Sequence, residues 1–447
     1  MTRVLFVSAE PLGPAMAGPA IRVAELARAV AANCSVTVAA PAPSHPGELP
    51  VDLVEAPLSD FERLLAMIAA HDVVVAQRLP PQLLRRVASL PVRFVADLYN
   101  PQMIEVLEAV GHRGGTSPER AWRSMLGQCA VADLVICASD KQRDLWLGGM
   151  GLAGLIDLER YRADPTFRSY VEVVPFGLPD EPPASERPVL KGVWAQIGAE
   201  DQVLLWAGGI WRWLDAITPI RAVERLRAQG HPVHLVFLGV GRPSLDQATI
   251  PTAADAAIAF AADRGLEGRC VHFNPGWVPY AARASYLLEA DLGVCAHHDH
   301  LEARFSFRTR VLDHFWAGLP SVVSSGDAIG ELVELRGLGR AVAPGDDAAF
   351  AAACATLLTD VEARRRVAER VREEAKGMRW SRVAEPLVRF CVEAAGRPPR
   401  RPARAALARA TYGQYPAILA DARERGGLRE LARRVPRHVA RLVRHGR

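Results

Sequence analysis

The sequence of 447 residues predicts an α/β protein with two doubly wound domains that face each other across a cleft. Three observations predict this fold class. Short β-rich runs alternate with helical stretches through the first half, a proline-rich acidic segment interrupts them, and the same alternation then begins again. Parallel strands joined by helices produce such a rhythm, so each half is expected to form its own parallel sheet.

The first domain is expected over residues 1–187. It opens with the strand VLFVSA at 4–9, and the helical stretch AIRVAELARAVAA at 20–32 follows. Four further runs have the valine-rich composition of buried parallel strands: VTVAAP, DVVVAQ, VRFVADL and LVICAS. The segment LPDEPPASERP at 178–188 then predicts a linker, because its prolines and charges disfavour regular structure.

The second domain is expected over residues 188–378. Ligands of doubly wound sheets bind beyond the carboxyl ends of the strands, so the segments that follow these strands are the candidate binding loops. Its strands are predicted in the runs VLLWAGG at 203–209, VHLVFLGVG at 233–241, CVHFNPG at 270–276, LGVCAHH at 292–298 and SVVSSGD at 321–327.

Two segments follow the second domain. Residues 379–396 predict a helix that packs back on the first domain, and residues 397–447 form a tail with 14 Arg against 3 Asp and Glu. The tail predicts a basic amphipathic helix that binds an anionic membrane surface, and a solvated tail interrupted at Pro436 is the alternative. Nucleic acid is not an expected partner, because the positive charge is confined to this tail. The apolar stripe consists of Leu428, Leu431, Val435, Val439 and Leu442.

Composition predicts a cytoplasmic protein, with peripheral attachment to the inner face of the membrane as an extension of the tail hypothesis. No uncharged apolar run reaches the length of about 18 residues that a membrane span needs, and no signal-peptide pattern opens the chain. The 7 cysteines are scattered and never spaced as CxxC, which favours reduced core residues over disulfides or a zinc site.

The most informative segment is residues 297–327, which predicts a loop, a helix from Arg308 to Ala317 and a strand. Ser306 is a candidate cap for this helix. Arg308 and Arg310 would lie in its first turn, where the helix dipole disfavours cations unless an anion binds there. The pattern predicts a diphosphate site, and two solvated arginines on a surface helix are the alternative.

The segment LDHFWAGLPSVVS at 312–324 resembles the donor-site helix and strand of retaining glycosyltransferases of the family-4 type, glycosyl transferases group 1. The resemblance covers roughly residues 3–392 and implies the GT-B fold, with two Rossmann-like domains facing a cleft. It also implies a nucleotide diphosphate sugar as donor, retention of configuration, and no metal or other cofactor. The other segments that resemble the family, in the same order, are GPAIRVAELARAVA, VADLVICASDKQRDLW, VEVVPFGLPD, LLWAGGIWRWLD, HLVFLGVGRP and VHFNPGWVPYAARASYLLEADLGV.

The sequence departs from this family at its charged positions. Two glutamates separated by seven residues are usual there, and here Phe305 takes the first place and Asp313 the second. Glu302 is the candidate substitute for the first. Gly209 and Leu214 occupy the places of the family's Arg and Lys, so Arg212, Arg308 and Arg310 are expected to supply that charge.

Three residues, Glu302, Asp97 and His298, are candidates for a catalytic role. The resemblance assigns Glu302 to the transferred sugar, and it assigns Asp313, a donor-binding residue, to the donor ribose. Asp97, with Tyr99 and Asn100, follows a predicted strand and is a candidate to orient the acceptor hydroxyl, although a structural turn is an equal alternative. His298 is the third candidate, and either it or His297 is expected to contact the sugar or phosphate. The expected donor-binding residues are Gly18, Gly208, Gly209, Arg212, Trp277, Val278, Arg308, Thr309, Arg310 and Asp313.

The sequence therefore predicts transfer of a sugar from a nucleotide diphosphate donor to a hydroxyl of a glycan, a lipid-linked or a small-molecule acceptor. A catalytically silent GT-B protein that binds a nucleotide sugar, a partner or a membrane is the first alternative, because the usual first Glu is missing. A nucleotide-sugar epimerase is the second. A dinucleotide-dependent dehydrogenase is disfavoured, because no GxGxxG follows either opening strand.

Overall fold

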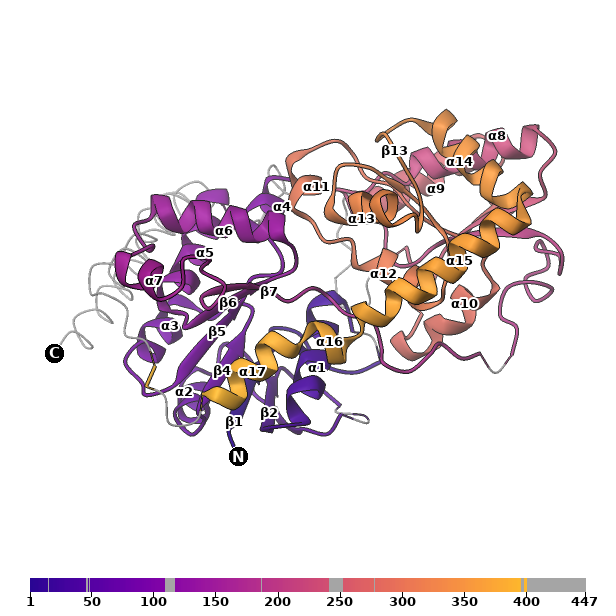
Figure 1. The fold of residues 1–447 in the computed structure, drawn as a ribbon. Helices are drawn as coiled ribbons and strands as arrows, with labels where there is room; N and C mark the ends of the chain where they lie inside the picture. Colours follow the sequence, from indigo (N-terminus) through magenta and orange to yellow (C-terminus); the bar gives the residue numbers. More distant parts are fainter. Residues whose placement is uncertain are drawn as a thin grey trace, which may run out of the picture.

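The protein is described from a computed structural model. Two domains lie side by side, and each has a twisted parallel sheet with helices on both faces (Figure 1). The structure describes residues 1–14, 16–45, 47, 49–108, 117–185, 187–240, 252–276, 278–394 and 398–399. Trp277 and nearly all of the 397–447 tail fall outside these residues, so the predictions made for them remain predictions.

The first domain contains a seven-stranded sheet in the order β3-β2-β1-β4-β5-β6-β7. Its strands are short, valine-rich and mostly buried, as expected for parallel strands that helices cover on both faces. Every neighbouring pair in the order is parallel. The strands are β1 (Arg3–Val7), β2 (Ser35–Ala40), β3 (Asp52–Glu55), β4 (Val73–Ala76), β5 (Arg93–Asp97), β6 (Leu134–Cys137) and β7 (Val171–Val173).

The helices of this domain begin at polar caps in most cases. Asp60, Ser117, Ser139 and Asp157 each accept a hydrogen bond from a first-turn backbone N–H, which satisfies a donor that has no partner within the helix. The first helix lacks such a cap. The helices are α1 (Gly18–Ala31), α2 (Phe61–Ala69), α3 (Pro81–Val87), α4 (Gln102–Glu108), α5 (Pro118–Val131), α6 (Asp140–Leu152) and α7 (Leu158–Ala163).

The second domain repeats the plan with a six-stranded parallel sheet in the order β10-β9-β8-β11-β12-β13. The strands are β8 (Gln202–Trp206), β9 (Val233–Phe237), β10 (Val271–Phe273), β11 (Leu292–Cys295), β12 (Ser321–Ser324) and β13 (Gly339–Val342). The helices are α8 (Ile217–Ala228), α9 (Ala253–Asp263), α10 (Arg283–Glu289), α11 (Leu301–Phe305), α12 (Thr309–Trp316), α13 (Ala328–Arg336), α14 (Asp347–Thr359) and α15 (Val361–Ala375), with a 3-10 turn η1 (Tyr280–Ala282).

Both sheets reverse their winding direction at the same place. In the first sheet β1 lies between β2 and β4, and in the second β8 lies between β9 and β11. The loops after β1 and β8 therefore leave their sheets at the switch points, where α/β proteins bind ligands. The two-domain doubly wound fold predicted from the sequence is confirmed.

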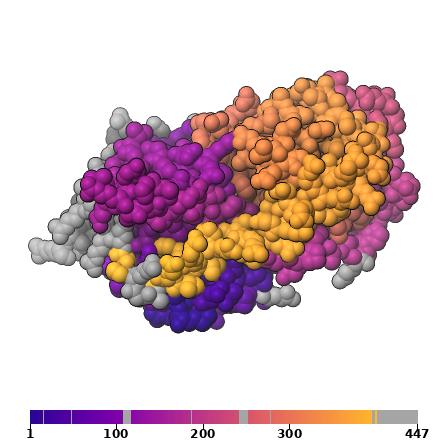
Figure 2. All heavy atoms as spheres, viewed as in Figure 1, coloured from indigo at the N-terminus to yellow at the C-terminus, as the bar shows by residue number. Residues whose placement is uncertain are grey.

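The last helices return to the first domain. After α15 and the turn η2 (Lys376–Met378), α16 (Trp380–Val383) and α17 (Glu385–Glu393) contact α1. The yellow segment crosses from one domain to the other along the surface (Figure 2). The two segments that connect the domains are hydrogen-bonded to each other where they cross. The backbone N–H of Leu178 donates to Met378 O at 2.8 Å, and the N–H of Trp380 donates to Leu178 O at 2.8 Å.

Gly177 sits at this crossing because no side chain fits there. A Cβ at position 177 would lie 2.6 Å from Cδ2 of Trp380, whose ring is 1% exposed and packs 4.9 Å from the ring of Phe176. We therefore expect Gly177→Ala to lower the free energy of unfolding by about 1–3 kcal/mol, the usual cost of overpacking. Urea unfolding followed by tryptophan fluorescence measures the change.

The matched control is Gly148→Ala, in the exposed part of α6, where nothing lies within 4 Å of the added Cβ. That change should be neutral or should stabilise the helix by about 0.5–1 kcal/mol. Equal unfolding midpoints for the two variants would contradict the packing role assigned to Gly177.

Three further sequence expectations have structural outcomes. The helix expected from Arg308 to Ala317 is present as Thr309–Trp316, but Ser306 does not cap it: its hydroxyl donates to Glu302 instead. All 7 cysteines are free and buried. Among the described residues, no helix has both the length and the apolar character needed to cross a membrane.

Candidate active site between the two domains

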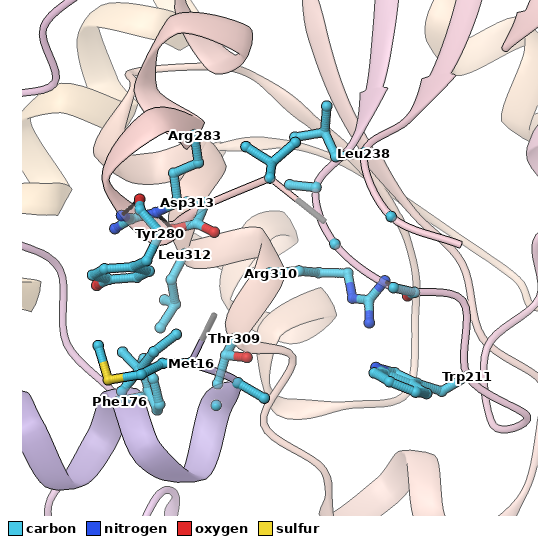
Figure 3. A pocket seen from close by; sticks show the side chains of 18 of the residues that line it. Met16, Phe176, Trp211, Leu238, Tyr280, Arg283, Thr309, Arg310, Leu312 and Asp313 are labelled. Atoms are coloured by element: carbon cyan, nitrogen blue, oxygen red, sulfur yellow. Dashed lines mark hydrogen bonds and ion pairs between the residues drawn. The ribbon is translucent and has the colours of Figure 1, made fainter. Parts of the chain in front are cut away.

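Two adjoining cavities lie between the switch points of the two sheets. The first has a volume of about 180 Å³ and is drawn in Figure 3. Its walls come from the loop after β1, the segment at Phe176 and Gly177, the loop after β8, and helices α10 and α12. The second has a volume of about 420 Å³ and extends toward α4 and α11. The residues that line both cavities are Ala17, Gly18, Trp211, Thr309 and Arg310.

Two helix N-termini meet at the boundary between the cavities. Helix α1 begins at Gly18 and α12 at Thr309, and neither N-cap residue provides a side-chain hydrogen bond. Neither helix has an acidic residue in its first turn. Because first-turn N–H groups have no acceptor within the helix, both ends present free donors and the positive end of a dipole. An anion is the ligand that this arrangement favours.

Arg310 adds a full positive charge at the same place. Its Nη1 donates to the backbone oxygen of Gly209 at 2.7 Å, and its guanidinium lies 5.2 Å from the ring centre of Trp206. Within the described residues, no carboxylate forms an ion pair with it. Loss of hydration lowers the pKa of this guanidinium, and Figure 3 shows it directed toward Trp211 and the loop after β8.

Gly208 and Gly209 form the loop that faces these two helix ends. Gly208 has φ +119°, a backbone conformation that a residue with a side chain rarely adopts, and nothing lies within 4 Å of an added Cβ. Because Gly208 has no side chain, the backbone of this loop borders the cavity directly. Both residues line the first cavity together with Gly18, Thr309 and Val278, all of which the sequence predicted for donor binding.

Arg308 differs from Arg310 because its charge is already neutralised. Its Nη1 and Nη2 donate to the two carboxylate oxygens of Glu302 at 3.0 and 2.7 Å, and its Nε lies 3.4 Å from Oδ2 of Asp327. Arg308 is 6% exposed and Glu302 is 1% exposed. The sequence assigned equal roles to Arg308 and Arg310, whereas the structure leaves only the second with a charge available to a ligand at this helix end.

Glu302 lines the second cavity, and its assignment to the transferred sugar stays a prediction. It belongs to the short helix α11, which His300 caps by accepting from the backbone N–H of Ala303. The hydroxyl of Ser306 also donates to Glu302. The carboxylate is therefore held by three donor groups in a fixed orientation on the cavity wall.

Asp313 is held in the first cavity by a residue that the sequence analysis missed. Nε of Arg283 donates to Oδ1 of Asp313 at 2.9 Å. The guanidinium of Arg283 lies 3.5 Å from the ring centre of Tyr280 and 4.5 Å from that of Trp316. The side chains of Tyr280, Arg283 and Asp313 gather at one end of the pocket, and Arg310 lies at the other (Figure 3).

Asp97 is placed differently from the expectation. Both of its carboxylate oxygens accept from Nε of Arg22, at 3.0 and 2.8 Å, and the two side chains are 3% and 0% exposed. Arg22 also donates to the backbone oxygens of Val174 and Pro175. Asp97 lines neither of the two cavities, because its carboxylate is directed toward Arg22 in this buried ion pair. The pair fixes α1 and the end of β7 against β5, which is a structural role.

Two other expected site residues are also outside these cavities. His298 and Arg212 are both exposed and line neither cavity. The backbone is extended after β11, so neighbouring side chains point to opposite sides: His297 turns inward and is 2% exposed, and His298 turns outward. Burial lowers the pKa of His297, which favours its neutral form.

The second cavity has a further wall to which both domains contribute. On the first-domain side it consists of Tyr99, Asn100 and Glu105, and on the second-domain side Trp211 and Trp213 contribute. Tyr99 and Asn100 follow β5, as noted from the sequence, but Glu105 in α4 gave no signal. No group of three or more His, Cys, Asp or Glu side chains suited to a metal ion occurs among the described residues.

Comparisons with known proteins agree with this architecture. A family model described as Glycosyl transferases group 1 matches residues 201–360. Anabaena HepE, solved with UDP and glucose, is 15% identical with a TM-score of 0.66, covering 88% of this chain and 100% of that chain. Sucrose-phosphate synthase from Thermosynechococcus elongatus is 17% identical with a TM-score of 0.63, covering 87% and 98%.

A third structure is WaaG, a glycosyltransferase involved in lipopolysaccharide biosynthesis, which is 18% identical with a TM-score of 0.58 and covers 88% of this chain and 100% of that chain. None of the curated proteins matches the sequence. At these identities the likeness establishes the fold. Retention of configuration and the family-4 type stay predictions. The resemblance to group 1 glycosyltransferases is confirmed at the level of the family model that residues 201–360 match and of the GT-B fold of the two domains.

Proposed function

We propose that this protein transfers a sugar from a nucleotide diphosphate sugar to an acceptor hydroxyl of a glycan, a lipid-linked or a small-molecule acceptor. One observation supports the proposal most directly. Arg310, which has no carboxylate partner among the described residues, lines both cavities at their junction, where two helices begin without side-chain caps. A diphosphate joins a nucleoside to a sugar, so its two flanking groups need a cavity on each side of the anion.

The first cavity suits the nucleoside. It is lined on one side by Val278, Tyr280 and Leu238, and Asp313 is held at its edge by Arg283. A carboxylate in this position can accept from the ribose hydroxyls, which is the role that the family resemblance assigns to Asp313. The second cavity then receives the sugar and the acceptor, with Glu302 on its wall.

The transfer step has a clear charge balance. The bond between the anomeric carbon and the diphosphate oxygen breaks, a bond to the acceptor oxygen forms, and the acceptor proton leaves with the nucleotide product. Arg310 and the first-turn N–H groups of α1 and α12 stabilise the charge that develops on the departing oxygen, since fixed donors need no reorganisation. The proposal assigns no metal ion or cofactor to this step.

The first test is thermal stabilisation by UDP, GDP, dTDP and ADP. A nucleotide at 100 times its dissociation constant should stabilise the folded state by about 2.7 kcal/mol, because it binds only that state. A positive result names the base, and turnover of the matching nucleotide sugar then tests transfer. NMR of the product's anomeric proton tests the further proposal of retention. Stabilisation without turnover, with any acceptor or water, would favour the catalytically silent alternative.

A further inference from the structure

Glu105 is a half-buried carboxyl on the first-domain wall of the second cavity. Among the described residues it forms no ion pair, in contrast to Glu302 with Arg308 and Asp97 with Arg22. Nδ2 of Asn100 donates a hydrogen bond of 3.1 Å to Oε2 of Glu105. Burial raises the pKa of this carboxyl to about 7. A neutral or half-charged carboxyl can both donate and accept a hydrogen bond.

Asn100 beside it is also incompletely satisfied. Its Oδ1 is buried and has no hydrogen-bond partner among the described residues, although it lines the same cavity. Buried polar atoms without a partner are costly, so natural proteins rarely keep them unless a ligand or water completes the set. Glu105 and Asn100 therefore present unused hydrogen-bonding groups to the cavity. The charged groups that face Glu105 from the second domain are Glu302 in α11 and Arg308 in the loop that follows it.

The opposite wall of this cavity is aromatic. Trp211 and Trp213, in the loop after β8, stack with ring centres 6.2 Å apart and planes 26° apart, and both line the cavity. Indole rings offer a large rigid apolar surface. A pyranose ring needs this combination, since its C–H face is apolar and its hydroxyls require polar partners at the edge. The volume of about 420 Å³ lies in the usual range of small-molecule sites.

We infer that the acceptor is itself a sugar, and that Glu105 with Asn100 binds its hydroxyls while Trp213 contacts its apolar face. This inference rests on the proposed function and names the substrate class of the same site. Glu105 is an acceptor-binding residue: it positions the hydroxyl that attacks the anomeric carbon, and the donor site at Arg310 is independent of it.

The experiment compares Glu105→Ala and Glu105→Gln with the control Glu119→Gln, an exposed residue of α5 paired with Arg123. The probes are methyl glucoside, methyl galactoside and methyl mannoside, with 4-nitrophenol and 1-octanol as acceptors that are not sugars. The donor is the nucleotide sugar whose nucleotide gives thermal stabilisation. Nucleotide release is measured with each acceptor and with water alone.

At least one hexoside should accelerate nucleotide release, and neither alcohol should. In Glu105→Ala the acceptor KM should rise by about 10- to 100-fold, because a hydrogen bond to a group of this kind is lost. Stabilisation by the nucleotide, which reports on the donor site alone, should be the same in Glu105→Ala and in Glu119→Gln. Glu105→Gln, which keeps both hydrogen-bonding functions, should stay within about threefold of the wild-type KM. Trp213→Ala should raise the same KM, and Trp213→Phe should do so less.

Three outcomes would overturn the inference: acceleration only by the alcohols, acceleration by no acceptor in a protein that binds the nucleotide, or an unchanged acceptor KM in both Glu105→Ala and Trp213→Ala. Absence of nucleotide binding in the wild-type protein is a different result. It would reject the proposed function itself and not the assignment of Glu105.

Discussion

Arg310→Ala is expected to abolish most of the stabilisation that a nucleoside diphosphate gives to this protein. Arg310 provides a positive charge at the junction of the two cavities, without a carboxylate partner among the described residues. A hydrogen bond to a charged group contributes about 1.5–3 kcal/mol, so the nucleotide should bind on the order of 10- to 100-fold more weakly. Thermal shift across a nucleotide titration measures the loss.

The matched control is Arg212→Ala. Arg212 lies three positions after Gly209, but it is exposed and lines neither cavity. Its removal should change the nucleotide affinity by less than about threefold, since exposed charges are screened by solvent. A large loss in Arg212→Ala with little loss in Arg310→Ala would move the diphosphate site to the outer side of the loop.

Removing the carboxylate of Glu302 is expected to have the largest effect on stability. In Glu302→Ala, the guanidinium of Arg308 remains buried and loses both of its hydrogen bonds to this side chain. Breaking a buried ion pair by deleting one partner costs about 3–5 kcal/mol, and the loss here should lie near the lower value because Asp327 stays 3.4 Å from Nε of Arg308. Urea unfolding should show this loss, and sugar transfer should fall with it.

A double variant separates stability from chemistry. Glu302→Met with Arg308→Met replaces the pair by apolar side chains and should recover part of the lost stability, because Asp327, with His297 at 3.7 Å, is then the one carboxylate of this cluster that stays buried. Transfer should remain absent if Glu302 also contacts the sugar. Glu331→Ala is the control, because its ion pair with Lys141 joins the domains at the surface and should contribute only about 0–1 kcal/mol. Full activity in the double variant would show that the carboxylate is structural.

Local sequence signals predicted the fold well. Runs such as VVVA in β4 and LVIC in β6 are apolar throughout because helices cover both faces of a parallel sheet. The helix at α12 could be located because Gly318, with φ +68°, ends it and an apolar strand follows. These signals depend on residues close together in the chain, which a single sequence displays directly.

The site was predicted less completely, because partners distant in the chain decide what a charged residue does. Asp97 follows a strand in the manner of a cleft residue, but Arg22, 75 positions earlier, binds both of its oxygens. Arg308 and Arg310 look equivalent in the sequence, and only the position of Glu302 in space separates them. Glu105 lacked any local signal, since its environment comes from α11 and the loop after β8 in the other domain.

Because α16 and α17 return to the first domain, that domain consists of two segments that are separated in the sequence by the second domain. Residues 1–187 alone lack Trp380, which fills the space over Gly177, and lack Phe390, whose ring lies 4.2 Å from the guanidinium of Arg93. The second domain is thus an insertion within the first. During synthesis it can complete its sheet first, whereas the first domain waits for the last helices to leave the ribosome. An expressed fragment that ends near residue 187 should expose apolar surface and aggregate unless residues 379–394 are supplied with it.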